Sequence, residues 1–195
     1  MTTQKLAQLI KSDSNYILDA SKCFKIYCVD KSTWGPGEWA DEPDLVLWQD
    51  WQSGLFCMIS RNDMMGHLCG YVGVDTSHPL HGKAATGLHA YYGVNYANEC
   101  ITDPNLHQTL HEALVEAKLW WFGFDCMHSN HDVVPAHFAV LNHYQAISQL
   151  EDASQFQKDL KALFDSPGAT YKNAEFVAQH CRSLTAQLAA MKTKG

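Results

Sequence analysis

The sequence is poor in the features that assign a chain to a familiar class at sight. Its seven cysteines form no CxxC pair, which excludes a zinc ribbon and a thioredoxin-type motif. Basic residues are few, 14 Lys and Arg against 21 Asp and Glu, and they do not cluster apart from a thin C-terminal tail. We therefore expect no nucleic-acid partner, because binding of the phosphate backbone requires grouped Lys and Arg.

Long apolar runs are also missing. No stretch reaches the length that spans a bilayer, and residues 1–11, MTTQKLAQLIK, lack the apolar centre of a secretory signal. We expect no membrane partner and a cytoplasmic location, where scattered cysteines stay reduced. Disorder is not expected, since 46% apolar and 11% aromatic residues are enough for a core.

The apolar periodicity predicts an α+β fold, in which helices flank a mostly antiparallel central sheet. Strands are expected over residues 24–29, 45–48, 55–60, 67–75, 88–97 and 119–124, and helices over residues 2–11, 103–118, 147–163 and 171–191. We expect one domain, with residues 1–33 as an N-terminal extension, 34–143 as the sheet core with its site loops, and 144–195 as a C-terminal helical pair.

The stretch from 119 to 137, LWWFGFDCMHSNHDVVPAH, combines an apolar strand with a polar, histidine-rich end. Asp125 and His128 lie where the strand becomes a loop, and both are candidate catalytic residues for acid–base chemistry. Cys126 is a third candidate, as a nucleophile or thiolate ligand, and equally reads as a small buried core group. Neighbouring strand residues face opposite sides, so Asp125 and Cys126 share a site only if the chain turns at Cys126.

The same stretch offers the donors of a metal site. Asp125, His128, His131 and Asp132 are close in sequence, and His89 is expected to arrive from a neighbouring strand. Carboxylate and several imidazoles without paired cysteines favour a catalytic zinc, manganese or iron ion that activates water. The alternative is that the histidines of an acidic protein lie in solvated loops.

Further residues are candidates for binding a ligand. Large aromatic side chains stack on a base or sugar ring, although such side chains more often belong to the core. Cys69 with His89 fits a Cys–His pair for nucleophilic catalysis, and His78 with Lys83 forms a polar loop suited to a phosphate or carboxylate. The predicted ligand-binding residues are Trp34, Trp39, Cys69, Tyr71, His78, Lys83, His89, Tyr92 and Tyr96.

Five spaced motifs resemble a family of uncharacterised proteins encoded by phages and prophages. They are WGPGEWADEP at 34–43, LCGYVGV at 68–74, HPLHGK at 78–83, WWFGFDCMH at 120–128 and the helix over 171–188, with a looser match at 89–97. The resemblance implies a phage or prophage origin and a location in the host cytoplasm. The family usually has Asp three positions after the last His of the fourth motif, where this chain has His131 followed by Asp132.

Two function classes follow from these observations. The first is a small metal-assisted hydrolase that acts on a small polar or nucleotide-like substrate, with Asp125, His128 and His89 in the site. The second is a non-catalytic protein that binds a nucleotide signal or a host protein, for example to counter host defence. In that case the aromatic residues and the Lys83 loop make the contacts.

Overall fold

The structure is a computed structural model that describes residues 29–99, 108–128, 131–137, 139 and 168–192. Its centre is a five-stranded sheet in the order β1-β2-β3-β5-β4, in which every pair of neighbours is antiparallel. The strands are β1 (Leu45–Gln49), β2 (Phe56–Arg61), β3 (Leu68–Val74), β4 (Tyr96–Asn98) and β5 (Trp120–Asp125), and the helices are η1 (Glu38–Ala40), α2 (Gln108–Ala117) and α5 (Ala174–Lys192).

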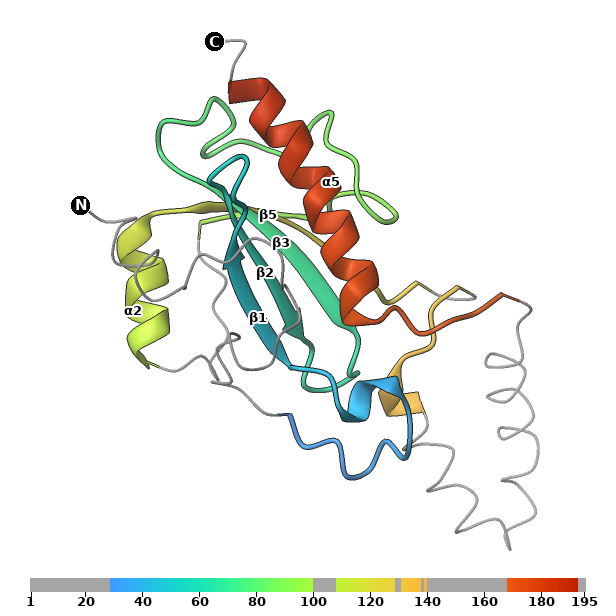
Figure 1. Cartoon of the computed structure of the whole chain (residues 1–195). Helices are drawn as coiled ribbons and strands as arrows, with labels where there is room; N and C mark the ends of the chain where they lie inside the picture. The colour runs from blue at the N-terminus through green and yellow to red at the C-terminus, as the bar shows by residue number, and fades with distance from the viewer. Residues whose placement is uncertain (1–28, 100–107, 129–130, 138, 140–167, 193–195) are drawn as a thin grey trace, which may run out of the picture.

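Helices cover both faces of this sheet (Figure 1). One face packs against α5, whose buried stripe includes Val177, Cys181 and Leu184. The other face packs against Ala113, Leu114 and Ala117 of α2. Each helix therefore buries one apolar stripe, and the alternation of side chains along each strand supplies an apolar residue to both faces.

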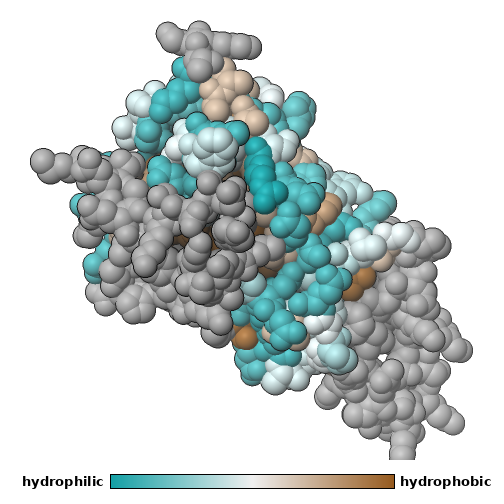
Figure 2. All heavy atoms as spheres, viewed as in Figure 1, coloured by the Kyte–Doolittle hydropathy of each residue, from teal (hydrophilic) through white to brown (hydrophobic). Residues whose placement is uncertain are grey.

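Strand β5 is buried between the two helices over its four middle residues. Phe122 and Phe124 face α5, while Trp121 faces α2, and all three are at most 1% exposed. A strand that is covered on both faces needs a nearly continuous apolar sequence, which residues 119–124 provide. The described surface in Figure 2 is correspondingly hydrophilic, with apolar atoms in small patches.

A buried charge network fastens the segment before β1 to the end of β2. The guanidinium of Arg61, whose side chain is 0% exposed, donates to Asp44 at 2.5 Å, to Glu42 at 3.1 Å and to the Tyr171 hydroxyl at 2.8 Å. Glu42 also accepts hydrogen bonds from Tyr171 and from the backbone of Ala174, the first residue of α5. Three segments far apart in sequence are thus joined at one point.

The predicted α+β fold is confirmed, and four of the expected strands are found within one or two residues. Residues 88–97 were expected to form one strand, and this is wrong except at Tyr96 and Ala97 in β4. The preceding residues form a turn in which the Gly93 amide bonds the Ala90 carbonyl at 3.0 Å. The expected helices over 2–11 and 147–163 and nearly all of the expected strand over 24–29 lie outside the described residues.

Gly70 and Gly73 lie on β3 at points of close packing. A Cβ atom on Gly70 would approach the Phe124 ring to 2.5 Å, whereas one on Gly73 would approach the Trp121 ring only to 3.1 Å. We expect Gly70→Ala to lower the free energy of unfolding by about 1–3 kcal/mol, because overpacking forces neighbours from their rotamers. Urea denaturation of Gly70→Ala and Gly73→Ala measures the difference, and a larger loss at Gly73 would contradict this packing.

Candidate functional site

The polar residues after β5 meet in a short turn. The backbone amides of His131 and Asp132 both donate to the His128 carbonyl, at 3.1 and 3.0 Å. This turn brings the Asp132 carboxylate back to His128, where it accepts from the backbone amide at 2.8 Å and lies 3.0 Å from Nδ1 of the ring. Because an ionised carboxylate only accepts hydrogen bonds, Nδ1 carries the proton and Nε2 is the bare nitrogen of the neutral imidazole.

Asp132 is held by further partners on its other oxygen. The Tyr91 hydroxyl donates to Oδ1 at 2.6 Å, and the Lys172 ammonium lies 3.6 Å from the same atom. The Asp132 side chain is 0% exposed, so these contacts replace the water that a buried carboxylate requires. Burial, together with the bond to Asp132, raises the pKa of Tyr91 well above its ordinary value, and the hydroxyl stays a donor.

The second nitrogen of His128 faces Asp125, the last residue of β5. Nε2 lies 3.9 Å from Asp125 Oδ1, which is too far for a hydrogen bond. The Asp125 carboxylate accepts from the Met127 amide at 3.0 Å and from the Asn95 side chain. The imidazole thus lies between the carboxylates of Asp125 and Asp132, with Nε2 on the Asp125 side and beyond hydrogen-bond distance of it.

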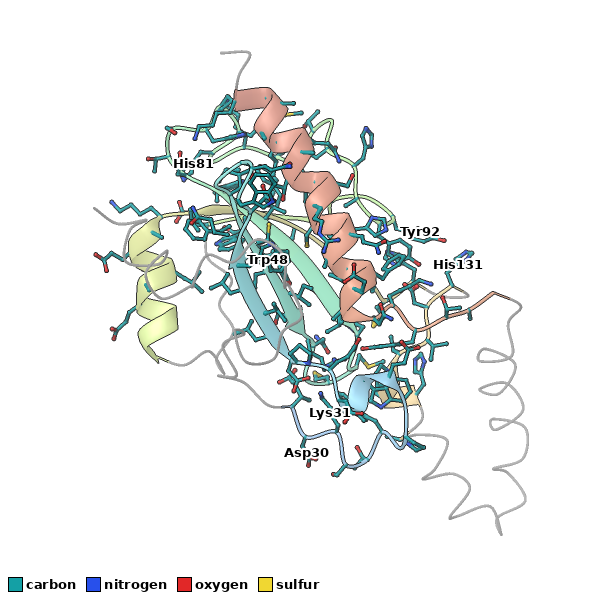
Figure 3. All side chains as sticks on the ribbon, in the orientation of Figure 1. Asp30, Lys31, Trp48, His81, Tyr92 and His131 are labelled. Carbon is teal, nitrogen blue, oxygen red and sulfur yellow. The ribbon has the colours of Figure 1, made fainter. Side chains whose placement is uncertain are left out.

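Aromatic rings surround His128 on two sides. The ring of Tyr92 stacks on the imidazole, with centroids 4.3 Å apart and planes at 18°, and Tyr91 meets it edge-on at 5.3 Å. Tyr92 also lies 5.4 Å from the ring of His131. His128 is only 22% exposed as a result. Figure 3 shows Tyr92 and His131 on the same side of the molecule, across α5 from α2.

His67 is a buried histidine next to this cluster that the sequence did not single out. Its Nδ1 atom has no hydrogen-bond partner within the part of the chain that the structure describes. Burial lowers the pKa of His67, and the charges of Asp125 and Asp132 oppose that shift only in part. His67 immediately precedes β3. The carbonyl of Leu68, the first residue of β3, accepts a hydrogen bond from the Cys126 amide at 3.1 Å. This pairing places His67 at the end of the sheet that carries the site.

The lowered pKa of His67 predicts an acid-sensitive fold. Below the ordinary histidine pKa of about 6.5, the unfolded chain binds a proton that folded His67 does not, so stability falls as the pH drops. We expect His67→Gln to reduce this slope by at most about 1.4 kcal/mol per pH unit between pH 7 and 5. Urea unfolding across this range measures it, with exposed His89→Ala as the control.

An unchanged slope in His67→Gln would contradict a neutral buried His67. Some acid sensitivity is expected to remain in that variant, because burial also lowers the pKa values of His137 and His180.

Of the residues predicted for catalysis or metal binding, the structure brings Asp125, His128 and Asp132 together. Asp132, and not His131, is the acid that contacts His128. Cys126 is 2% exposed and packs in the α5-side core, and burial raises the pKa of its thiol, so it lacks the setting of a nucleophile. The backbone of His89 is bonded to the Gln187 side chain.

The predicted ligand-binding residues are dispersed, with Tyr92 alone stacked on His128. Several are buried or engaged elsewhere, which suits packing better than ligand contact. Trp34 and Trp39 are each 4% exposed, and the ring of Tyr71 meets that of Tyr96 edge-on at 5.5 Å. Cys69 lies opposite Asp125 in the sheet, and burial raises the pKa of its thiol to about 12. His78 bonds the Leu188 carbonyl at 3.0 Å, and the Lys83 carbonyl accepts a hydrogen bond from Trp120.

The predicted metal site is not assembled in the described part of the chain. No three His, Cys, Asp or Glu side chains there are arranged to hold a metal ion. The oxygens of Asp125 and Asp132 already accept hydrogen bonds from Met127, Asn95, Tyr91 and His128. These carboxylates are therefore better placed to orient the His128 imidazole than to bind a cation.

Residues that the sequence did not predict complete the site. Tyr91 and Lys172 reach Asp132 from 41 and 40 positions away, and Asn95 reaches Asp125 from the loop before β4.

No helix among the described residues is long and apolar enough to cross a membrane. No protein-family model, curated protein or solved structure matches the chain.

Proposed function

We propose that the protein is a phage- or prophage-derived accessory enzyme that hydrolyses a small polar or nucleotide-like substrate, with His128 as its general base. The observation that carries this proposal is the 3.0 Å contact between Nδ1 of His128 and the buried carboxylate of Asp132. A carboxylate in this position fixes the tautomer of the imidazole and stabilises the cation that forms when Nε2 accepts a proton.

The reaction follows from that tautomer. A water molecule gives its proton to Nε2 of His128 as its oxygen attacks the substrate. The imidazolium is stabilised by Asp132 on one side and by Asp125 on the other, and it returns the proton to the leaving group. A positioned base of this kind accelerates hydrolysis by about 10²–10⁴-fold.

The test is hydrolysis of a panel of carboxyl esters, phosphate esters, nucleosides and nucleotides by the purified protein. We expect His128→Ala to lower the rate of any hydrolysis found by about 10²–10⁴-fold. His81→Ala is the control and is expected to retain the rate, because the His81 ring lies against Trp120 and the Lys118 carbonyl, outside the cluster. Equal rates for His128→Ala and the unmodified protein would refute the role of His128. A parallel series with EDTA tests metal assistance, which predicts loss of activity that added Zn²⁺, Mn²⁺ or Fe²⁺ restores.

The second candidate is a non-catalytic binding protein, such as an anti-defence factor that sequesters a nucleotide signal or blocks a host protein. The stacked ring of Tyr92 favours it, because this ring covers one face of the imidazole and offers an aromatic surface to a ligand. Saturable binding of a panel compound without any turnover, retained in His128→Ala, would support this candidate over the hydrolase.

A further inference from the structure

Tyr92 combines exposure with an unfavourable backbone. The residue is 59% exposed. Its φ of 52° lies in the left-handed region that bulky residues avoid. Neither property is expected of an aromatic residue that serves only to pack. Backbone strain of this type persists where the surrounding structure imposes it, and it gathers at functional sites.

The surroundings of Tyr92 do impose this conformation. Before it, both backbone groups of His89 are bonded to the Gln187 side chain of α5, each at 2.8 Å. After it, the Asn95 amide donates to the Gly123 carbonyl of β5 at 3.0 Å. Between these anchors Tyr91 points to Asp132 and Tyr92 lies on His128. The loop thus presents one tyrosine inward and the next to solvent.

The charges around Tyr92 restrict what can bind there. Asp125 is 31% exposed, and within the described part of the chain it accepts hydrogen bonds from the neutral amide groups of Asn95 and Met127, which do not neutralise its negative charge. The ammonium of Lys172 lies against Asp132 instead, at 3.6 Å. An anionic group next to His128 would be repelled by the negative charge of Asp125, whereas an uncharged or cationic ring would not.

We propose that Tyr92 is a stacking platform that binds a planar, uncharged or cationic ring of nucleobase type beside His128, and that the site disfavours ligands with phosphate at this point. The inference rests on the proposed function, which it narrows from small polar or nucleotide-like substrates to nucleoside-like ones. Tyr92 is a specificity-determining residue in this account, and proton transfer belongs to His128.

The test measures the binding of adenosine, guanosine, cytidine and adenosine 5′-monophosphate by calorimetry and by saturation-transfer NMR. The unmodified protein is expected to bind at least one nucleoside, and to bind adenosine at least several-fold more tightly than its monophosphate. Tyr92→Phe retains a ring and is expected to keep the affinity within about twofold. Tyr92→Gly removes the ring and is expected to weaken binding about tenfold or more.

Thermal denaturation separates this role from a structural one. Because glycine adopts positive φ without strain, Tyr92→Gly is expected to melt at the same temperature as the unmodified protein or higher while losing affinity. A lower melting temperature with unchanged nucleoside affinity would overturn the proposal, as would the absence of nucleoside binding at millimolar concentration. Tighter binding of the monophosphate than of adenosine would overturn the charge preference.

The experiment also separates this inference from the proposed function. Asp132→Asn leaves Tyr92 in place and is expected to keep nucleoside binding while losing turnover. Binding that depends on Tyr92 without any hydrolysis would support the platform and contradict the hydrolase. Hydrolysis that depends on His128 but is indifferent to Tyr92→Gly would contradict the platform alone.

Discussion

Arg61→Ala is expected to lower the free energy of unfolding by about 3–5 kcal/mol, the largest stability effect that the structure predicts. The substitution removes a fully buried guanidinium from the Asp44 and Glu42 carboxylates, whose side chains are 4% and 15% exposed. Among the described residues Lys31, at 2.8 Å from Asp44, then remains as the cation of this network. The Tyr171 hydroxyl loses a donor as well. For a chain of this size the loss corresponds to about 10 °C in melting temperature, and urea and thermal denaturation measure it.

Arg182→Ala is the matched control for that experiment. Arg182 also pairs with a carboxylate, that of Glu175 at 3.3 Å, but both side chains are 46% exposed. Exposed pairs of this kind contribute between 0 and about 1 kcal/mol, so the control is expected to remain close to the unmodified protein. Similar losses at the two arginines would show that burial of the Arg61 network does not govern its contribution.

Asp132→Asn is expected to reduce kcat/KM of the proposed hydrolysis by about 10²–10⁴-fold, although the change replaces one oxygen by an amide nitrogen. Without its charge, residue 132 no longer stabilises the His128 imidazolium, and its amide group permits the opposite tautomer. Tyr91→Phe removes only the 2.6 Å bond to the far oxygen of Asp132 and is expected to cost about tenfold or less. Steady-state rates on the best panel substrate give both values.

The control for this series is Asp63→Asn, at an exposed acid in the turn between β2 and β3. It removes the same charge from the protein without touching the cluster and is expected to leave the rate unchanged. A reduction of less than about threefold in Asp132→Asn would contradict the assigned role of this carboxylate.

The sheet could be predicted from the sequence because its strands are apolar on faces that helices cover. Residues 119–124 have the continuous apolar pattern of a strand buried on both sides, and β5 occupies almost those positions. Residues 88–97 were also expected to form a strand, yet most of them form a loop, since the Gln187 side chain takes both backbone hydrogen bonds of His89 and the Gly93 amide bonds the Ala90 carbonyl in a turn. Local periodicity cannot reveal a tertiary competitor of this kind.

The candidate site was predictable only in its local part. Asp125 and His128 lie at the end of an apolar strand, so the sequence placed them where the strand becomes a loop. The contact of Asp132 with His128 depends on a turn, and those of Tyr91 and Lys172 depend on segments about 40 positions away. Trp34 and Trp39 were predicted to bind a ligand, but both side chains are buried. Aromatic residues in a loop pack in the core as readily as they line a pocket, and the sequence does not distinguish the two.

Asp132 is expected to hold the imidazole of His128 in the tautomer that leaves Nε2 free to act as a base. Long-range ¹H–¹⁵N NMR of the histidine rings, recorded above pH 7, tests it without knowledge of the substrate. We predict a His128 ring with its proton on Nδ1 and a bare Nε2, and a change in this pattern in Asp132→Asn. A proton on Nε2 with Nδ1 bare, or a spectrum that Asp132→Asn leaves unaltered, would contradict the role of Asp132 in fixing this tautomer.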